Sequence, residues 1–191
     1  MIRPIRTLAV GAAAVALVVG VSASPAAAKT RTFTDKSDDA VAALDITKVK
    51  VKNKKHVVVI RASVPGLDKA KVGGVSVGIR TKAKGRPEYA LSKVRAEGRW
   101  MPVTFMDLKS EDIMVSCKGD RISFGKKSVT VRIPQRCLGA NKKAVRVGVA
   151  LFGRDLDEVM IDEEPTSGPD AQFDVYPTIA SNRLSPWVRY R

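Results

Sequence analysis

The sequence has little of what metal, haem and redox chemistry require: one histidine, two cysteines and 5% aromatic residues. His56 alone would need metal or haem partners that the sequence does not offer. The two cysteines lack the Cys-x-x-Cys spacing of redox motifs, and a structural zinc site needs four ligands. The shortage of aromatic side chains argues against base stacking as a main source of nucleic-acid affinity. We therefore expect no catalytic cofactor, and contact with nucleic acid only of a non-specific kind.

A hydrophobic run long enough to span a bilayer is also missing. The longest run, residues 8–21, has 14 residues, whereas a transmembrane helix needs about 20. Two arginines precede it and three alanines end it at residues 26–28, which is the pattern of a cleaved secretory signal peptide. We expect residues 1–28 to be removed and the remaining chain to be secreted, with no membrane insertion after cleavage. An uncleaved N-terminal anchor is the alternative.

Export determines how the two cysteines are interpreted. Outside a reducing cytosol Cys117 and Cys137 can pair, and the short loop between them would stabilise the fold by roughly 3 kcal/mol in the chain-entropy model. We predict one disulfide.

Hydrophobic residues recur at every second position through most of the remaining sequence, as in strands with one buried face. The alternating segments are residues 47–51, 75–79, 101–105, 113–115, 129–133 and 145–151. Residues 56–64 are apolar at both parities, which suits a central strand, and residues 134–138 suit one helical turn. Frequent turn signals separate these segments. They predict eight to ten strands in one all-β domain, residues 29–191, folded as an antiparallel β-sandwich (Ig-like or jelly-roll-like) rather than a barrel.

Charge is unevenly distributed along the chain. Residues 29–154 contain 29 Lys and Arg against 11 Asp and Glu, whereas residues 155–191 contain 3 against 8. The basic residues fall mainly on outward strand positions, where they suit salt-dependent contact with a polyanion. The candidate anion-binding residues are Lys48, Lys50, Lys52, Arg80 and Lys82. A solvated face that prevents edge-to-edge pairing of strands is the alternative.

The acidic residues offer a candidate calcium site, because Ca²⁺ prefers several oxygen ligands and tolerates flexible loops. The candidate ligands are Asp155, Asp157 and Asp162, within an acidic loop at residues 155–170 that precedes a C-terminal tail at residues 177–191. A second acidic group, Asp35, Asp38 and Asp39, lies near the predicted new N-terminus. Neither group has the spacing of a dedicated calcium loop, so a solvated or ion-paired loop is the alternative.

One motif matches a hydrolase signature by letter alone. Residues 74–78 spell G-x-S-x-G, but that nucleophile elbow requires a strand-to-helix turn and a histidine later in the chain. His56 precedes Ser76, and the segment alternates as a continuous strand. We therefore expect no catalytic residues here.

The segments at residues 45–51, 57–61 and 75–89 resemble the strand pattern of small secreted actinobacterial β-sandwich proteins of unknown function. They are also loosely similar to the opening half of DOMON and family 9 carbohydrate-binding-module sandwiches. This resemblance implies a β-sandwich that binds sugar or haem. Together with the charge, it leads us to expect a secreted, non-enzymatic binding or interaction module for an anionic or carbohydrate polymer of the cell envelope. A secreted hydrolase or an enzyme-inhibitor accessory is the alternative.

Overall fold

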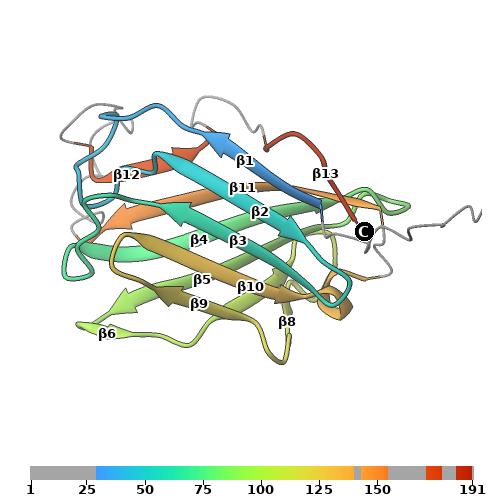
Figure 1. Cartoon of the computed structure of the whole chain (residues 1–191). Helices are drawn as coiled ribbons and strands as arrows, with labels where there is room; N and C mark the ends of the chain where they lie inside the picture. The colour runs from blue at the N-terminus through green and yellow to red at the C-terminus, as the bar shows by residue number, and fades with distance from the viewer. Residues whose placement is uncertain (1–28, 140–142, 155–170, 178–183, 191) are drawn as a thin grey trace, which may run out of the picture.

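The structure, a computed structural model, describes residues 29–139, 143–154, 171–177 and 184–190. In these ranges the chain forms two antiparallel β-sheets that lie face to face (Figure 1). The predicted all-β sandwich with one disulfide is confirmed. No helix in the same ranges has the length and hydrophobicity of a membrane span.

The first sheet has five strands in the spatial order β1, β2, β3, β10, β9. Their bounds are β1 Lys29–Thr34, β2 Lys48–Asn53, β3 Val57–Ser63, β10 Ser128–Pro134 and β9 Arg121–Phe124. β1 and β9 therefore form the two edges of this sheet.

The second sheet has the order β12, β11, β4, β5, β7, β8, with β13 paired to β11 and β6 paired to β5. Its strands are β4 Val72–Thr81, β5 Glu88–Ala96, β6 Arg99–Trp100, β7 Thr104–Asp107, β8 Met114–Val115, β11 Ala144–Gly153, β12 Phe173–Tyr176 and β13 Val188–Arg189. The long strands β4 and β11 lie side by side in its centre.

Period-two alternation builds the core between the sheets. In β2, the exposed Lys48 and Lys50 alternate with Val49 and Val51, which are fully buried. The same pattern recurs in β3, β4, β10 and β11, whose inward valines, isoleucines and leucines are at most 2% exposed. Complete burial of such a side chain contributes roughly 1.5–3 kcal/mol. The interface between the sheets is therefore the main source of stability.

The predicted helical turn and the predicted disulfide lie together at one end of the sandwich. The turn is the 3-10 helix η1, Gln135–Leu138, which follows β10. Cys137 in this turn is bonded to Cys117, 20 residues earlier, in the crossover from β8 of the second sheet to β9 of the first. Arg136 also donates a hydrogen bond to the carbonyl oxygen of Lys118. The crossover between the sheets is thus fixed to η1 by a covalent and a polar contact.

Two details differ from the sequence-based expectations. The described residues form thirteen strands rather than eight to ten, because several edge strands have only two residues. Residues 101–103 are not part of a strand, and β7 begins at Thr104. Pro102 has no backbone N–H to continue a ladder, and Met101 is 45% exposed.

Two other expectations are confirmed. β3 is central in its sheet, between β2 and β10, although its outward Val57 and Val59 are only half-buried. Ser76 lies within the continuous strand β4, and His56 is exposed. The G-x-S-x-G letters therefore do not form a nucleophile elbow.

Candidate anion-binding site

The outer face of the first sheet carries a row of lysines. Lys48, Lys50 and Lys52 occupy alternate positions of β2, which places them about 7 Å apart along the strand. The three candidates on this strand do share one face, as their parity predicts.

Arginines from the neighbouring strands extend this lysine row across the sheet. Lys50 lies opposite Arg61 of β3, and Arg132 of β10 lies opposite Arg121 of β9. None of the five strands contains an Asp or Glu. Like charges directly opposite one another destabilise an antiparallel pair. The sheet therefore has a basic outer face whose repulsion a bound polyanion would relieve.

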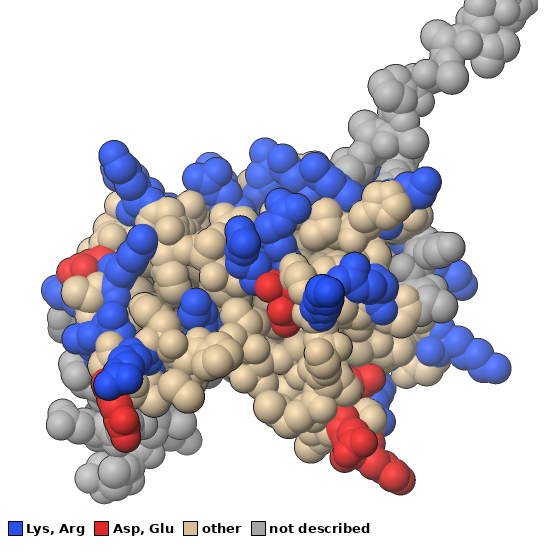
Figure 2. Space-filling view, turned by 90° about the horizontal axis from the view of Figure 1, so that it is seen from below, with Lys and Arg blue, Asp and Glu red and all other residues tan. Residues whose placement is uncertain are grey.

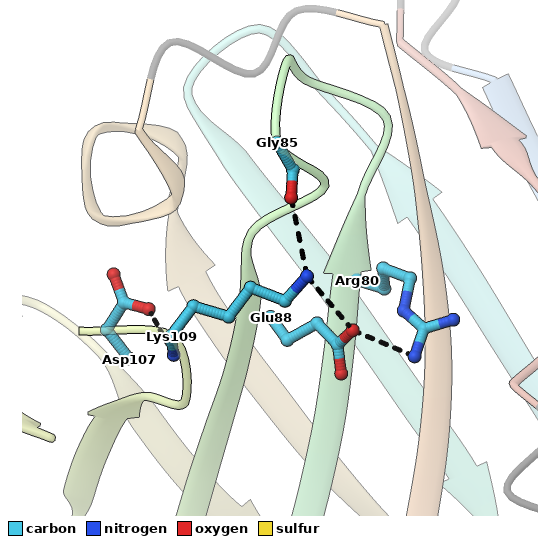
Figure 3. Close-up of polar contacts among 5 residues, drawn as sticks. All are labelled: Arg80, Gly85, Glu88, Asp107 and Lys109. Atoms are coloured by element: carbon cyan, nitrogen blue, oxygen red, sulfur yellow. Dashed lines mark hydrogen bonds and ion pairs between the residues drawn. The ribbon is translucent and has the colours of Figure 1, made fainter.

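Arg80 and Lys82 lie away from this row: Arg80 is on β4 of the second sheet, and Lys82 directly follows the end of that strand. Arg80, on β4, forms a 2.8 Å ion pair with Glu88 of β5, and Lys109 lies 3.6 Å from the same carboxylate oxygen (Figure 3). The Arg80 hydrogen bond and the two cationic charges hold the pKa of Glu88 below its usual value. The structure thus separates the five candidates into the β2 row and two residues at the end of β4, of which Arg80 already has an acidic partner.

Lys82 lines an open pocket where β1, β11 and β13 meet. The pocket has a volume of about 710 Å³, within the range of ligand sites in proteins. Its lining residues are Lys29, Arg31, Lys82, Lys143, Ala144, Trp187 and Arg189. Five of these seven residues are cationic, and no acidic residue is among them. We call this site the basic pocket.

The short strand β13 builds the wall of the basic pocket by joining the two sheets. Its backbone pairs with β11, with Arg189 opposite Ala144. From the first sheet, Arg31 donates a 3.2 Å hydrogen bond to the carbonyl oxygen of Trp187, and the buried amide of Asn53 donates a 3.0 Å bond to that of Val188. Gln135 of η1 in turn donates to the Asn53 side chain at 2.6 Å. β13 is thus held from both sheets, and residues far apart in the sequence converge on one pocket.

Trp187 provides the one aromatic surface of the basic pocket. Its side chain is half-buried, with the Arg146 guanidinium 4.8 Å and the Lys82 ammonium 5.9 Å from the ring centre. Such cation–π contacts contribute about 0.5–1 kcal/mol at exposed sites. They fix the position of the indole beside the cationic groups, so that the pocket offers both a charged and an apolar surface.

Trp100 occupies a similar environment at another edge of the sandwich. Its ring lies 4.8 Å from that of Phe124 in β9, with Arg95 at 5.2 Å and Lys93 at 5.9 Å. Because Trp100 packs between strands of the two sheets, we assign it a structural role. Both tryptophans are half-buried and so lie between core and surface. The sequence alone did not show whether they belong to the core or to the surface.

The face of the molecule shown in Figure 2 is predominantly basic. Figure 2 shows the side of the molecule that faces down in Figure 1, where Lys and Arg side chains are spread widely and Asp and Glu form a few separate groups. The excess charge is therefore not confined to one patch, and the basic pocket is distinguished by its concave shape and its indole.

The predicted calcium ligands have different outcomes. Asp155, Asp157 and Asp162 lie outside the described residues. In the second acidic group, Asp38 is exposed, whereas Asp35 and Asp39 are half-buried in the connection between β1 and β2. Asp39 lies close to Asp45 and Asp174, two buried residues that the sequence analysis did not select.

The fold and the basic pocket together define a two-sheet, disulfide-linked β-protein with a concave cationic site. Comparison of the chain with protein-family models, curated proteins and solved structures gave no match.

Proposed function

We propose that the protein is an exported, non-enzymatic binding module that holds an anionic polymer, with the basic pocket as its main contact. The observation that carries this proposal is the convergence of five cationic residues and Trp187, without an acidic residue, on one pocket. Bringing like charges together is unfavourable unless counterions or a ligand compensate them. An anionic group in the pocket would provide that compensation.

A polymer fits this site better than a small anion does. Lys52 lies opposite Thr30 of β1, next along the strand from the pocket residues Lys29 and Arg31. The β2 lysine row is therefore one strand, about 4.8 Å, away from the strand that lines the pocket. Because side chains alternate along a strand, Lys29 and Arg31 point to the opposite face of β1 from Lys52. A polymer with one charged unit in the pocket would therefore pass around the β1 edge to reach the basic outer face. The indole suits the apolar surface of a sugar ring, so a charged glycopolymer is the ligand class that we favour.

Export would add to the charge of the basic pocket. The first described strand begins at Lys29, the residue that we expect to follow signal-peptide cleavage. Cleavage there would create an α-amino group on a pocket residue, and such a group has a pKa of about 7.7–8.0. The mature protein would then carry a further positive charge at its site, which the precursor lacks.

The decisive experiment measures binding of the mature protein to polyphosphate and to polygalacturonate at several salt concentrations. The pocket variant is Lys29→Gln/Lys82→Gln/Arg189→Gln. The control, Lys69→Gln/Lys126→Gln/Lys127→Gln, removes the same charge from exposed turn residues outside the pocket. We expect the pocket variant to lose about tenfold or more in affinity. The slope of the logarithm of the binding constant against the logarithm of the salt concentration should become shallower by up to about 2–3. The control should change both quantities less.

Two results would contradict the proposal. Equal losses in the pocket and control variants would mean that net charge alone attracts the polymer. Shortening of the polymer during incubation would instead favour the hydrolase alternative.

A further inference from the structure

Four aspartates gather where the β1–β2 connection meets β12, on the other sheet. Asp35, Asp39 and Asp45 belong to the connection, and Asp174 belongs to β12. One carboxylate oxygen from each of Asp39, Asp45 and Asp174 lies within 4.8 Å of the other two. The backbone N–H of Ile46 donates a hydrogen bond to Asp174, 128 residues away, which holds the connection against β12.

The carboxylates of this cluster are buried or half-buried, and within the described residues backbone N–H groups compensate them only in part. Asp45 is only 8% exposed and Asp174 only 3%. Oδ1 of Asp45, Oδ1 of Asp39 and Oδ2 of Asp35 are buried oxygens with no hydrogen-bond partner among the described residues. The ion pairs found in the same ranges go to Glu88, so no lysine or arginine there neutralises the cluster. Buried charges are normally paired or coordinate a metal, which makes this arrangement anomalous in a chain of net charge +15.

The electrostatic environment of the cluster disfavours its ionised carboxylates. Burial, together with the neighbouring aspartate charges, raises the pKa of Asp174 from 3.8 to about 7, although the Ile46 N–H opposes the shift. Burial raises the pKa of Asp35 to about 7 in the same way, with contributions from Asp39 and Asp45. A bound cation would oppose both shifts, because it stabilises the ionised carboxylates.

We propose that Asp39, Asp45 and Asp174, supported by Asp35, form a calcium-binding site. Ca²⁺ takes oxygen ligands at 2.3–2.6 Å, so two ligands on opposite sides of the ion lie about 4.6–5.2 Å apart. The three oxygens lie within 4.8 Å of one another, so one Ca²⁺ ion could contact all of them. Mg²⁺ demands near-ideal octahedral geometry and usually keeps several waters, so a carboxylate cluster supplied by a loop and an edge strand suits Ca²⁺ better. Water molecules would complete the coordination of the calcium ion.

Calcium would join the two sheets at this point. Three of the four aspartates lie in the connection that leads from β1 to β2, and the fourth is on an edge strand of the opposite sheet. The ion would therefore bind the folded arrangement and not the unfolded chain, and such a ligand raises the unfolding temperature. This inference does not depend on the proposed binding of anionic polymer.

The test is thermal unfolding of the mature, disulfide-intact protein, first treated with EDTA and then titrated with CaCl2 to about 10 mM, above the range for extracellular calcium modules. Ionic strength is held constant with NaCl. We expect a saturable increase in Tm of about 5–10 °C, reversed by EDTA, and a clearly smaller increase with MgCl2. Isothermal titration should detect the same site.

The key variant is Asp39→Asn, because Asp39 contributes an unpartnered oxygen to the cluster. Without calcium it should be at least as stable as the natural protein, since it removes one repulsive charge, and it should lose the calcium response. Asp45→Asn is a second variant with the same expectation, and Asp112→Asn, at an exposed position, is the control that should retain the response. No Tm shift at about 10 mM calcium, an unchanged shift in Asp39→Asn, or an equal response to magnesium would overturn the assignment.

Discussion

Removing the disulfide tests whether the crossover between the sheets depends on a covalent link. The bridge joins residues 20 positions apart, and the chain-entropy relation for a loop of this length gives about 3 kcal/mol of stabilisation at 25 °C. The perturbation is Cys117→Ala/Cys137→Ala, in which alanine avoids placing a hydroxyl at Cys117, where the side chain is 6% exposed. We expect the free energy of unfolding to fall by about 3 kcal/mol.

The assay is guanidinium chloride unfolding followed by tryptophan fluorescence. With an m-value of about 4 kcal/mol/M, the midpoint should fall by about 0.8 M. The m-value itself should increase slightly, because the unfolded chain without the bridge is more expanded. A loss below about 1 kcal/mol would refute the reasoning. It would show that the Arg136–Lys118 bond and the local packing hold the crossover without the bridge.

The disulfide also has an indirect connection to the basic pocket. Cys137 lies in η1, where Gln135 holds Asn53 and Asn53 holds the carbonyl oxygen of Val188. Loosening η1 should therefore weaken β13 and lower polyanion affinity as well as stability. Polyphosphate binding by the double alanine variant, measured at a temperature where it is fully folded, separates this effect from unfolding.

Three other predictions concern the β2 lysine row, the predicted signal peptide and Glu88. Lys48→Gln/Lys50→Gln/Lys52→Gln should weaken polyphosphate binding and lower its salt slope by up to about 2–3 while leaving stability unchanged or slightly higher; unaltered affinity would mark the row as a solvated face. N-terminal sequencing of exported protein should begin at Lys29 or within a few residues of it, and recovery of Met1 would contradict cleavage. Glu88, whose pKa is lowered, stabilises the fold above its ordinary value of 4.5, and this contribution disappears as pH falls through the lowered value. Glu88→Gln should therefore make the free energy of unfolding less dependent on pH between about pH 5 and 3. The difference from the natural protein should be less than about 1 kcal/mol, because the ion pair is partly solvated.

Strand alternation predicted the central strands because burial on one face dictates their sequence. Val75, Val77 and Ile79 face the core and are at most 1% exposed. The same rule fails at the edges. In β5, Lys93 and Arg95 occupy the same alternate positions as the buried Leu91. Trp100 covers these two side chains in place of a hydrophobic layer. β1 has polar residues at both parities, so periodicity alone could not reveal it.

The sites were less predictable than the strands because they depend on long-range pairing. The lysine row of β2 follows from parity within one strand, and it was predicted. The basic pocket requires Arg31 to meet Trp187, 156 residues later, and the aspartate cluster requires Asp174 to meet the β1–β2 connection. No local pattern encodes the pairing of β13 with β11 or the position of β12. Of the basic pocket only Lys82 was a candidate from the sequence, and of the aspartate cluster only Asp35 and Asp39 were.

The position of β13 has a consequence for the nascent protein. Every other described strand precedes β13 in the chain, so the wall between β1 and β11 can form only after almost all of the polypeptide has been synthesised. β1 pairs only with β2, and until β13 is in place nothing else covers its other side. An unpaired edge of this kind can associate with another chain. Lys29 and Arg31 lie on that edge, and two incomplete chains would each present these cations to the other. The charges that line the basic pocket in the finished protein would thus discourage aggregation while the chain is still incomplete.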